Sequence, residues 1–235
     1  MPSPPGGSGE AGATWALIAA AGTGERLGVE RPKAFARLGG RPLLAESINR
    51  LDVCPWVDAI VVAAPAAWEE PVILLAEELA ASKVVSCVTG GTTRAESVRA
   101  ALAEVPHEAV VVLVHDAARP LLEDEVVERV LAPLAEGFDG AVPALPIPDT
   151  VKRVQGHVVV ETLERNALVR AQTPQAFLAD SLRRAFAGDL GGATDCASLL
   201  ERAGARVAVV EGDPRLVKVT TKDDLVFVER LLATS

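Results

Sequence analysis

Short hydrophobic runs alternate with longer amphipathic stretches along most of the chain. The runs are rich in Ala, Val and Ile, and they predict strands at Thr14–Ala20, Asp58–Ala64, Lys83–Val88, Ala109–Val114, Asp139–Leu145 and Ala205–Glu211. The stretches between and after them predict helices at Pro42–Arg50, Ala66–Ala81, Arg94–Glu104, Asp124–Glu136, Pro174–Phe186, Thr194–Ala203 and Lys222–Leu232. Continuous apolar strands separated by helices indicate a mostly parallel sheet covered on both faces. We therefore expect a three-layer α/β fold.

One segment departs from this alternation. Between Pro148 and Thr173 the sequence suggests two extended pieces joined at Gln155–Gly156, with polar residues throughout. It has too few apolar positions for a pair of core strands, so we expect a projecting β-arm over residues 149–170 that finds its partner elsewhere. A solvated surface hairpin is the alternative. The first residues, 1–12, have the Pro, Gly and Ser content of a flexible tail, and residues 13–235 contain no further linker of this kind.

Composition narrows the class of protein. Lys and Arg total 23 against 32 Asp and Glu, a formal charge of −9, which disfavours binding to nucleic-acid phosphates. Apolar residues make up 49% of the chain, yet no run reaches the roughly 18 residues that a membrane span requires. The beginning lacks the pattern of a signal peptide, and the three cysteines form no C-x-x-C pair. We expect a soluble cytoplasmic protein without nucleic-acid or membrane partners.

The strongest chemical signal is the sequence AAAGTGERL at Ala19–Leu27, followed by RPKAF at Arg31–Phe35. Small residues allow a backbone to approach a ligand closely and to form an anion-binding nest, to which Arg26 and Lys33 add positive charge. The dinucleotide fingerprint fails because Leu27 stands where its third glycine should be, and no G-x-x-x-x-G-K-[ST] motif is present. We therefore interpret the segment as a loop that wraps a nucleoside triphosphate. A glycine-rich strand–helix turn with two surface cations is the alternative.

Three further segments carry weaker signals. GGTTRAESV at Gly90–Val98 opens a predicted helix and would serve equally as an ordinary strand–helix turn. HDAARP at His115–Pro120 follows the most apolar strand, where Asp116 could hold Mg²⁺ (or another divalent cation) or cap a turn. Thr194–Asp195 begins a predicted helix, whose end could receive an anion or be capped by Thr194.

Taken together, these motifs resemble the 2-C-methyl-D-erythritol 4-phosphate cytidylyltransferase family, which uses CTP in the non-mevalonate isoprenoid pathway. The resemblance runs from about Trp15 to Leu232 and includes PDTVKR, RNALVRAQTPQAF, TD-AS at Thr194–Ser198 and VKVT at Val217–Thr220. Ala21 stands where related sugar-nucleotide pyrophosphorylases usually carry Gly. The resemblance implies a Rossmann-like nucleotidyltransferase domain that dimerises by exchanging its β-arm between two subunits.

The resemblance also implies the roles of individual residues. Those around CTP would be Ala20, Ala21, Gly22, Arg26, Lys33, Gly91, Thr92 and Ser97. Those facing the sugar phosphate and Mg²⁺ would be Asp116, Ala117 and Arg119. Those holding methylerythritol phosphate would be Thr150, Arg165, Thr173 and Thr194, with Lys218 between the two substrates. The catalytic set would be Arg26, Lys33, Lys218 and Arg165, with Asp116 at the metal. The chain departs from the family pattern at Thr92, where some members carry an acid, and at Cys196, where Asp or Glu is usual.

The chemistry that this family performs suits such a residue set. The phosphate of the acceptor attacks the α-phosphorus of CTP, and pyrophosphate leaves in line. A phosphate monoester is already a competent nucleophile, so positioning and neutralisation of negative charge matter more than a general base. Two alternatives stay open at this point: a cytidylyltransferase for another polyol phosphate, such as ribitol 5-phosphate, and a non-catalytic nucleotide-binding module.

Overall fold

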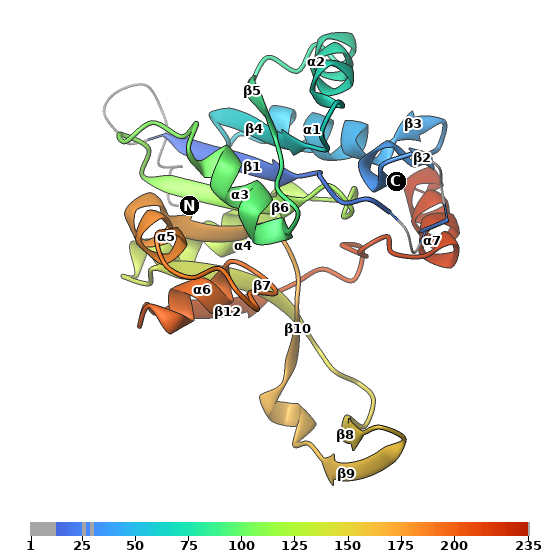
Figure 1. Cartoon of the computed structure of the whole chain (residues 1–235), viewed down its shortest axis with the longest axis vertical. Helices are drawn as coiled ribbons and strands as arrows, with labels where there is room; N and C mark the ends of the chain where they lie inside the picture. Colours follow the sequence, from blue (N-terminus) through green and yellow to red (C-terminus); the bar gives the residue numbers. More distant parts are fainter. Residues whose placement is uncertain (1–12, 25–26, 29–30, 235) are drawn as a thin grey trace.

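A central mixed sheet organises the computed structural model, which describes residues 13–24, 27–28 and 31–234 (Figure 1). The strands are hydrogen-bonded in the order β10-β7-β11-β6-β1-β4-β5. β10 and β11 pair with different parts of β7, and β12 also pairs with β7. Their bounds are β1 (Thr14–Ala19), β4 (Ala59–Ala64), β5 (Val84–Thr89), β6 (Val111–Asp116), β7 (Gly140–Pro146), β10 (Val169–Ala171), β11 (Gln175–Leu178) and β12 (Val207–Glu211). The β1, β4, β5 and β6 strands are mutually parallel, and β7 and β12 form a second parallel pair. The expected α/β class with a mostly parallel sheet is confirmed.

The strand that connects the parallel group β1, β4, β5 and β6 to the parallel pair β7 and β12 differs from the sequence prediction. Residues Gln175–Leu178 form the antiparallel strand β11 between β6 and β7, so the helix predicted at Pro174–Phe186 is wrong over its first part. Only α5 (Ala179–Phe186) is helical there. Ala176 and Phe177 are fully buried on opposite faces of the sheet. A short apolar run of this kind fits strand and helix periods equally well, because its length is too small to separate them.

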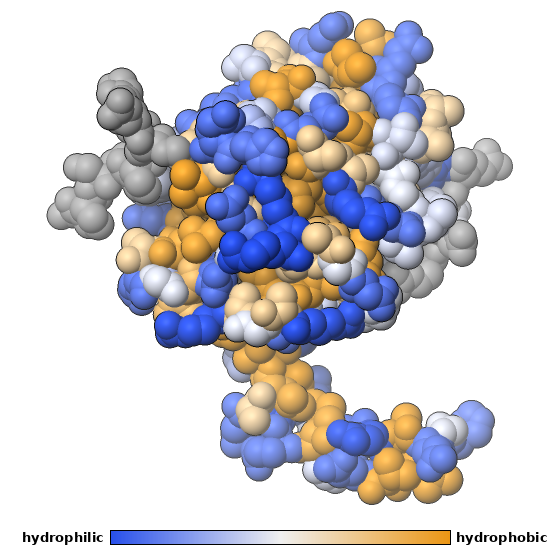
Figure 2. All heavy atoms as spheres, turned by 60° about the vertical axis from the view of Figure 1, so that its left-hand side comes forward, coloured by the Kyte–Doolittle hydropathy of each residue, from blue (hydrophilic) through white to orange (hydrophobic). Residues whose placement is uncertain are grey.

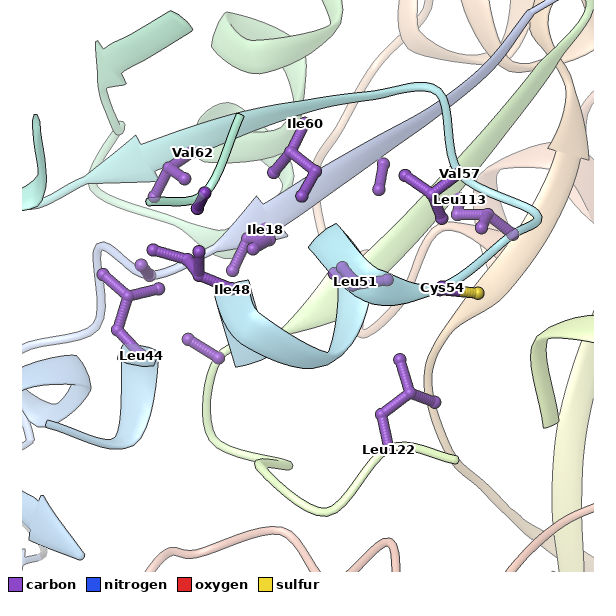
Figure 3. Close-up of a cluster of buried hydrophobic side chains, with 14 of the residues drawn as sticks. Ile18, Leu44, Ile48, Leu51, Cys54, Val57, Ile60, Val62, Leu113 and Leu122 are labelled. Carbon is purple, nitrogen blue, oxygen red and sulfur yellow. The ribbon is translucent and has the colours of Figure 1, made fainter. Parts of the chain in front are cut away.

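Helices cover both faces of the sheet, and successive side chains along each strand point to opposite faces. Helices α1 (Leu43–Val53), α2 (Glu69–Glu78) and α4 (Asp124–Ala135) pack on one face, whereas α3 (Arg94–Leu102), α5 and α6 (Ala197–Arg202) pack on the other. Figure 3 shows the first face, where Leu44, Ile48 and Leu51 of α1 meet Ile18 of β1 and Ile60 of β4. In β1 the neighbouring residue Leu17 belongs to the opposite cluster.

The segment after β7 forms an arm that projects away from the sheet (Figure 1). It contains the antiparallel strands β8 (Lys152–Gln155) and β9 (Val158–Thr162) and the 3-10 turn η3 (Arg165–Ala167), and it returns through β10. Its side chains are not polar throughout, contrary to the sequence interpretation. Val154, Val158, Val159, Val160 and Val169 are all at least half exposed, and Figure 2 shows hydrophobic residues among the polar ones of the arm.

A third, smaller cluster holds the C-terminal part of the chain against the start of α1. Leu27, Leu38 and Leu43 pack there with Val219 and with Val228 of α7 (Lys222–Ala233). Small strands β2 (Arg37–Leu38) and β3 (Arg41–Pro42) form the neighbouring hairpin. This packing fixes the extended segment that carries Lys218. None of the helices within the described residues is long and apolar enough to cross a membrane.

Candidate active site

The loop after β1 and the 3-10 turn η2 (Lys33–Phe35) form one wall of the site. The Lys33 amide donates a hydrogen bond of 3.1 Å to the Gly22 carbonyl, which brings this lysine back to the glycine loop. Gly24 has φ +81°, and a Cβ there would meet the Lys33 backbone nitrogen at 3.0 Å. Glycine is therefore required both for the left-handed turn and for the close approach.

A second glycine loop approaches the first from β5. A Cβ on Gly90 would lie 2.4 Å from the Ala21 Cβ and 2.8 Å from the Ser97 Oγ. The Gly91 amide donates to Ser97 Oγ at 3.1 Å, and the Ser97 hydroxyl lies 2.9 Å from the Thr93 carbonyl. Thr93 and Glu96 form a reciprocal capping box that starts α3. These bonds fix the shape of the second loop, which meets the first at Gly90 and Ala21.

Asp116, at the end of β6, lies at the centre of the charged part of the site. Its Oδ1 accepts a hydrogen bond from Arg94 Nε and its Oδ2 accepts one from Lys218 Nζ, both at 2.7 Å. Burial alone would raise the pKa of this carboxyl, but the charges of Arg94 and Lys218 hold it well below its usual range. Asp116 is therefore ionised at neutral pH and aligns two cations toward one point.

Two adjoining cavities share this charged group. The first, of about 260 Å³, is lined by the two glycine loops, Lys33, Thr92, Thr93 and Ala118. The second, of about 230 Å³, is lined by Arg119, Ala171, Gln172, Thr173, Gln175, Thr194 and Asp195. Arg94, Asp116 and Lys218 line both. The arrangement can hold two anionic molecules with a common cationic wall between them.

The turn after Asp116 is fixed to the segment that carries Lys218. Arg119 donates to the Leu216 carbonyl at 2.6 Å and to the Ala171 carbonyl at 3.3 Å. The Val219 amide donates to the Ala118 carbonyl at 2.8 Å. Arg119 therefore serves as a structural tie as well as a cavity-lining cation.

The structure brings together most of the residues predicted from the sequence, and it separates some others. Ala21, Gly22, Lys33, Gly91, Thr92, Ser97, Asp116 and Lys218 line the first cavity, while Arg119, Thr173 and Thr194 line the second. Ala20 and Ala117 are buried in the scaffold behind them and line neither cavity. Arg26 lies outside the described residues.

Two of the predicted residues lie on the arm. Thr150 and Arg165 are exposed there, and among the described residues that line the two cavities neither appears. Arg165 donates a hydrogen bond to the Pro148 carbonyl at the base of the arm. Within a single chain these two residues are therefore not joined to the charged centre.

Sequence reasoning missed several residues of the site. Arg94 lies inside the predicted motif GGTTRAESV but was not singled out, although it lines both cavities. Gln175 donates to Asp195 Oδ2 at 2.8 Å, and Asp195 Oδ1 accepts from the Ser198 amide. The prediction that Thr194 begins a helix is wrong, because α6 begins at Ala197 and Asp195 caps its first turn.

The departure from the family pattern at Cys196 has a structural consequence. Arg94 Nη1 donates to the Cys196 Sγ at 3.3 Å, and this thiol is almost fully buried. Burial raises the pKa of Cys196, so the residue is a neutral thiol beside the guanidinium. Asp116 is therefore the charged partner of Arg94.

The donor set can be compared with the needs of a divalent cation. Within the described residues, no group of three or more His, Cys, Asp or Glu side chains is placed to hold a metal ion. Mg²⁺ commonly takes one or two carboxylates and receives its other ligands from substrate phosphates and water. Asp116 fits this pattern, although both of its oxygens already accept hydrogen bonds from cations. The residues suit a cation held chiefly by substrate phosphates.

Comparisons with known proteins agree with this geometry. The sequence matches the family described as 2-C-methyl-D-erythritol 4-phosphate cytidylyltransferase over residues 14–234. A protein of that name from Nocardia farcinica is 46% identical over 222 residues, covering 94% of each chain. Another from Rubrobacter xylanophilus is 40% identical and covers 93% of this chain and 94% of its own length.

Solved structures give the same result. A structure named 4-diphosphocytidyl-2C-methyl-D-erythritol synthase has a TM-score of 0.80 and 33% identity, covering 94% of this chain and 98% of that one. The 2-C-methyl-D-erythritol 4-phosphate cytidylyltransferase from Thermus thermophilus has a TM-score of 0.75 and 34% identity, covering 93% and 98%. The chain belongs to the 2-C-methyl-D-erythritol 4-phosphate cytidylyltransferase family, as its motifs predicted.

Proposed function

We propose that this chain transfers CMP from CTP to 2-C-methyl-D-erythritol 4-phosphate where its two cavities meet, at Arg94, Asp116 and Lys218. The products are 4-diphosphocytidyl-2-C-methyl-D-erythritol and pyrophosphate, and the reaction is a step of isoprenoid precursor biosynthesis. One observation supports the assignment of the two substrates to the two cavities: Arg94 and Lys218 both bind Asp116, and all three residues line both cavities.

CTP is assigned to the first cavity. Ala21, Gly22 and Gly91 line it, and these small residues leave backbone groups accessible that could bind one edge of a pyrimidine. Lys33 lines the same cavity and supplies positive charge for the triphosphate. Arg26, which lies outside the described residues, is proposed for the same role from the sequence motif alone.

Methylerythritol phosphate is assigned to the second cavity. Thr194 and Asp195 supply polar groups there, Arg119 supplies a further cation, and Thr173 lines the same cavity. Lys218 borders both cavities, so its ammonium can donate hydrogen bonds to oxygens of the attacking phosphate and of the α-phosphate that is attacked. From this position Lys218 would both orient the acceptor phosphate and offset the negative charge on the phosphate oxygens in the transition state.

The residues present support an in-line displacement without a general base. The acceptor phosphate is already anionic at neutral pH, and the cationic side chains of Arg94 and Lys218 line the cavity assigned to it. Lys33 would offset the negative charge that develops on the leaving pyrophosphate. The wall also orients the two substrates so that the attacking oxygen and the leaving group lie on opposite sides of the α-phosphorus.

Mg²⁺ dependence is part of the proposal. Asp116 would hold the cation together with triphosphate oxygens, and a bound Mg²⁺ would neutralise phosphate charge and orient the triphosphate. Removing divalent cations with a chelator should abolish pyrophosphate release, and adding Mg²⁺ back should restore it. Full activity in the chelator would contradict this part.

The assignment of the acceptor is tested by measuring pyrophosphate release with CTP, Mg²⁺ and each of two polyol phosphates. We expect rapid release with 2-C-methyl-D-erythritol 4-phosphate and little with ribitol 5-phosphate. A higher kcat/KM for ribitol 5-phosphate would overturn the acceptor assignment, and no release with either would favour a non-catalytic nucleotide-binding module.

We also propose that the arm completes the site of a partner subunit in a homodimer. Three features support this: the arm projects from its own sheet, its valines are exposed, and Arg165 lies apart from the charged centre. An arginine suits a bidentate grip on the acceptor phosphate. Exchange across a twofold axis would give each site one subunit's core and the other subunit's arm.

Mixing two inactive variants tests the exchange. Lys33→Ala impairs the core and Arg165→Ala impairs the arm, so a heterodimer formed by refolding them together would contain one intact site. Random pairing makes about half of the dimers mixed, which predicts roughly a quarter of wild-type activity. If mixed dimers form and activity stays at the average of the two variants, the arm does not act on the partner's site.

A further inference from the structure

His115 is a buried titratable residue that the proposed reaction does not use. It precedes Asp116 at the end of β6, and its exposed fraction is 0%. The hydrogen bonds of its ring within the described residues go to a backbone carbonyl and a hydroxyl and not to a carboxylate, so the buried imidazole is neutral. A buried polar ring needs hydrogen-bond partners, and both ring nitrogens have one.

The partners determine which nitrogen carries the hydrogen. His115 Nε2 lies 3.1 Å from the Arg119 carbonyl oxygen, which can only accept, so the hydrogen must be on Nε2. His115 Nδ1 is then an acceptor, and it lies 3.3 Å from the Thr173 Oγ1. The Thr173 hydroxyl therefore donates to Nδ1.

The same hydroxyl oxygen accepts a hydrogen bond from the Asp116 backbone amide at 3.0 Å. Gln175 of β11 pairs with Val114 of β6, and continuing this register sets Thr173 opposite Asp116. There the Thr173 side chain takes the place of a strand carbonyl. Because its hydrogen is directed to His115, its lone pairs are left for the Asp116 amide.

We propose that His115 is a positioning residue for the transfer reaction: through Thr173 it fixes the Asp116 amide, and through Asp116 it aligns Lys218 and Arg94. This inference rests on the function proposed above. The chain of contacts runs from Nδ1 to the Thr173 hydroxyl, to the Asp116 amide, and from the Asp116 carboxylate to both cations. Thr173 therefore orients Asp116 through its backbone amide, and its hydroxyl need not donate to the acceptor substrate.

Two replacements separate the two hydrogen bonds of the ring. In His115→Asn the amide oxygen falls near the position of Nδ1 and can still accept from Thr173, whereas the bond to Arg119 is lost. In His115→Gln the amide nitrogen reaches toward the Arg119 carbonyl, whereas the acceptor for Thr173 is lost. Both variants remove the ring, and they differ from each other by one methylene group.

The proposal predicts that kcat falls roughly tenfold further in His115→Gln than in His115→Asn, the size expected for one buried hydrogen bond. KM for CTP should change less than kcat, because the hydrogen bonds of the ring go to Arg119 and Thr173 and not to the glycine loops. Equal kcat values, or a lower kcat in His115→Asn, would overturn the proposal. Melting temperatures measured in parallel show whether kcat merely follows stability.

Thr173→Val gives a second route to the same link. It removes the hydroxyl at nearly constant volume and should lower kcat about as much as His115→Gln. Adding His115→Gln to Thr173→Val should then lower kcat little further, since both changes break the same chain of contacts. Losses that multiply fully would contradict that chain.

The tautomer can be measured on the wild-type protein, whether or not the variants fold. Long-range ¹H–¹⁵N NMR distinguishes the two nitrogens of an imidazole, and the chain has three histidines to assign. At neutral pH we expect His115 to carry its hydrogen on Nε2. A hydrogen on Nδ1 would overturn the proposal while leaving the transfer activity, measured on the same sample, as an independent result.

Discussion

Replacing Asp116 by Asn perturbs the charged centre with almost no change in volume. The carboxylate accepts one hydrogen bond on each oxygen, from Arg94 and from Lys218, both at 2.7 Å. An amide has one oxygen, so it can accept from one of the two cations. The Arg94 side chain is 21% exposed and that of Lys218 is 40% exposed. We therefore expect the amide to stay with Arg94 and Lys218 to turn toward solvent.

The size of the effect follows from the lost contact. A hydrogen bond to a charged group contributes about 1.5–3 kcal/mol. At about 1.36 kcal/mol per tenfold, losing the alignment of Lys218 predicts a fall in kcat/KM of about 10- to 150-fold. The free energy of unfolding should fall by about 3 kcal/mol, because the largely buried Arg94 guanidinium loses its charged partner, whereas the displaced Lys218 regains water.

The assay is pyrophosphate release with varied methylerythritol phosphate at saturating CTP, alongside denaturant unfolding of the same preparations. Lys218→Met is the matched control, and at saturating Mg²⁺ adding Asp116→Asn to it should lower kcat/KM little further, because both changes break the contact between Lys218 and Asp116. A kcat/KM within about threefold of wild type would refute the reasoning. So would recovery at high Mg²⁺, since it would assign Asp116 to the metal alone.

Three further predictions concern the other parts of the site and its support. Lys33→Ala should lower kcat about 100- to 1000-fold with little change in melting temperature, since Lys33 is partly exposed; near-normal turnover would contradict its role. Steady-state kinetics should give a higher kcat/KM for CTP than for UTP and low values for ATP and GTP, because we assign the backbone groups at Ala21 and Gly91 to one edge of a pyrimidine and a purine would need more room; similar values for ATP and CTP would contradict this. The Thr220 hydroxyl bond lowers the pKa of Asp224 to about 2, and a depressed carboxyl pKa adds stability that is present at neutral pH and lost as the pH falls from about 4 toward 2. Asp224→Asn should therefore destabilise the protein by about 1 kcal/mol at neutral pH, as expected for a capping bond, and this difference from wild type should shrink in acid unfolding experiments.

The sheet was predictable where strands are continuous apolar runs. β4 is buried at every position, and β1 and β6 are buried at most of theirs, so these strands are apolar apart from Thr14 and the terminal pair His115 and Asp116. β11 was not, because its four residues pair antiparallel with strands distant in sequence, and no local pattern encodes that pairing. The exposed valines of the arm likewise have no local explanation, since nothing in their own chain covers them in the described structure.

The site was predictable where chemistry and position in the chain coincide. Asp116 ends a buried strand, and Lys33 follows a glycine loop, so both were found from local motifs. Arg94 and Gln175 were missed because their partners, Asp116 and Asp195, lie 22 and 20 residues away in sequence. The tie between Thr173 and Asp116 joins residues that are 57 positions apart. Such contacts depend on the strand order rather than on any short motif.

A crystal structure of the protein with bound 4-diphosphocytidyl-2-C-methyl-D-erythritol would test the shared-wall arrangement most directly. We predict that the cytidine lies between the loops at Gly22 and Gly91, that the methylerythritol lies beside Thr194, and that the diphosphate passes Lys218 at Asp116. Cytidine in the second cavity, or a diphosphate that contacts neither Lys218 nor Arg94, would contradict the account.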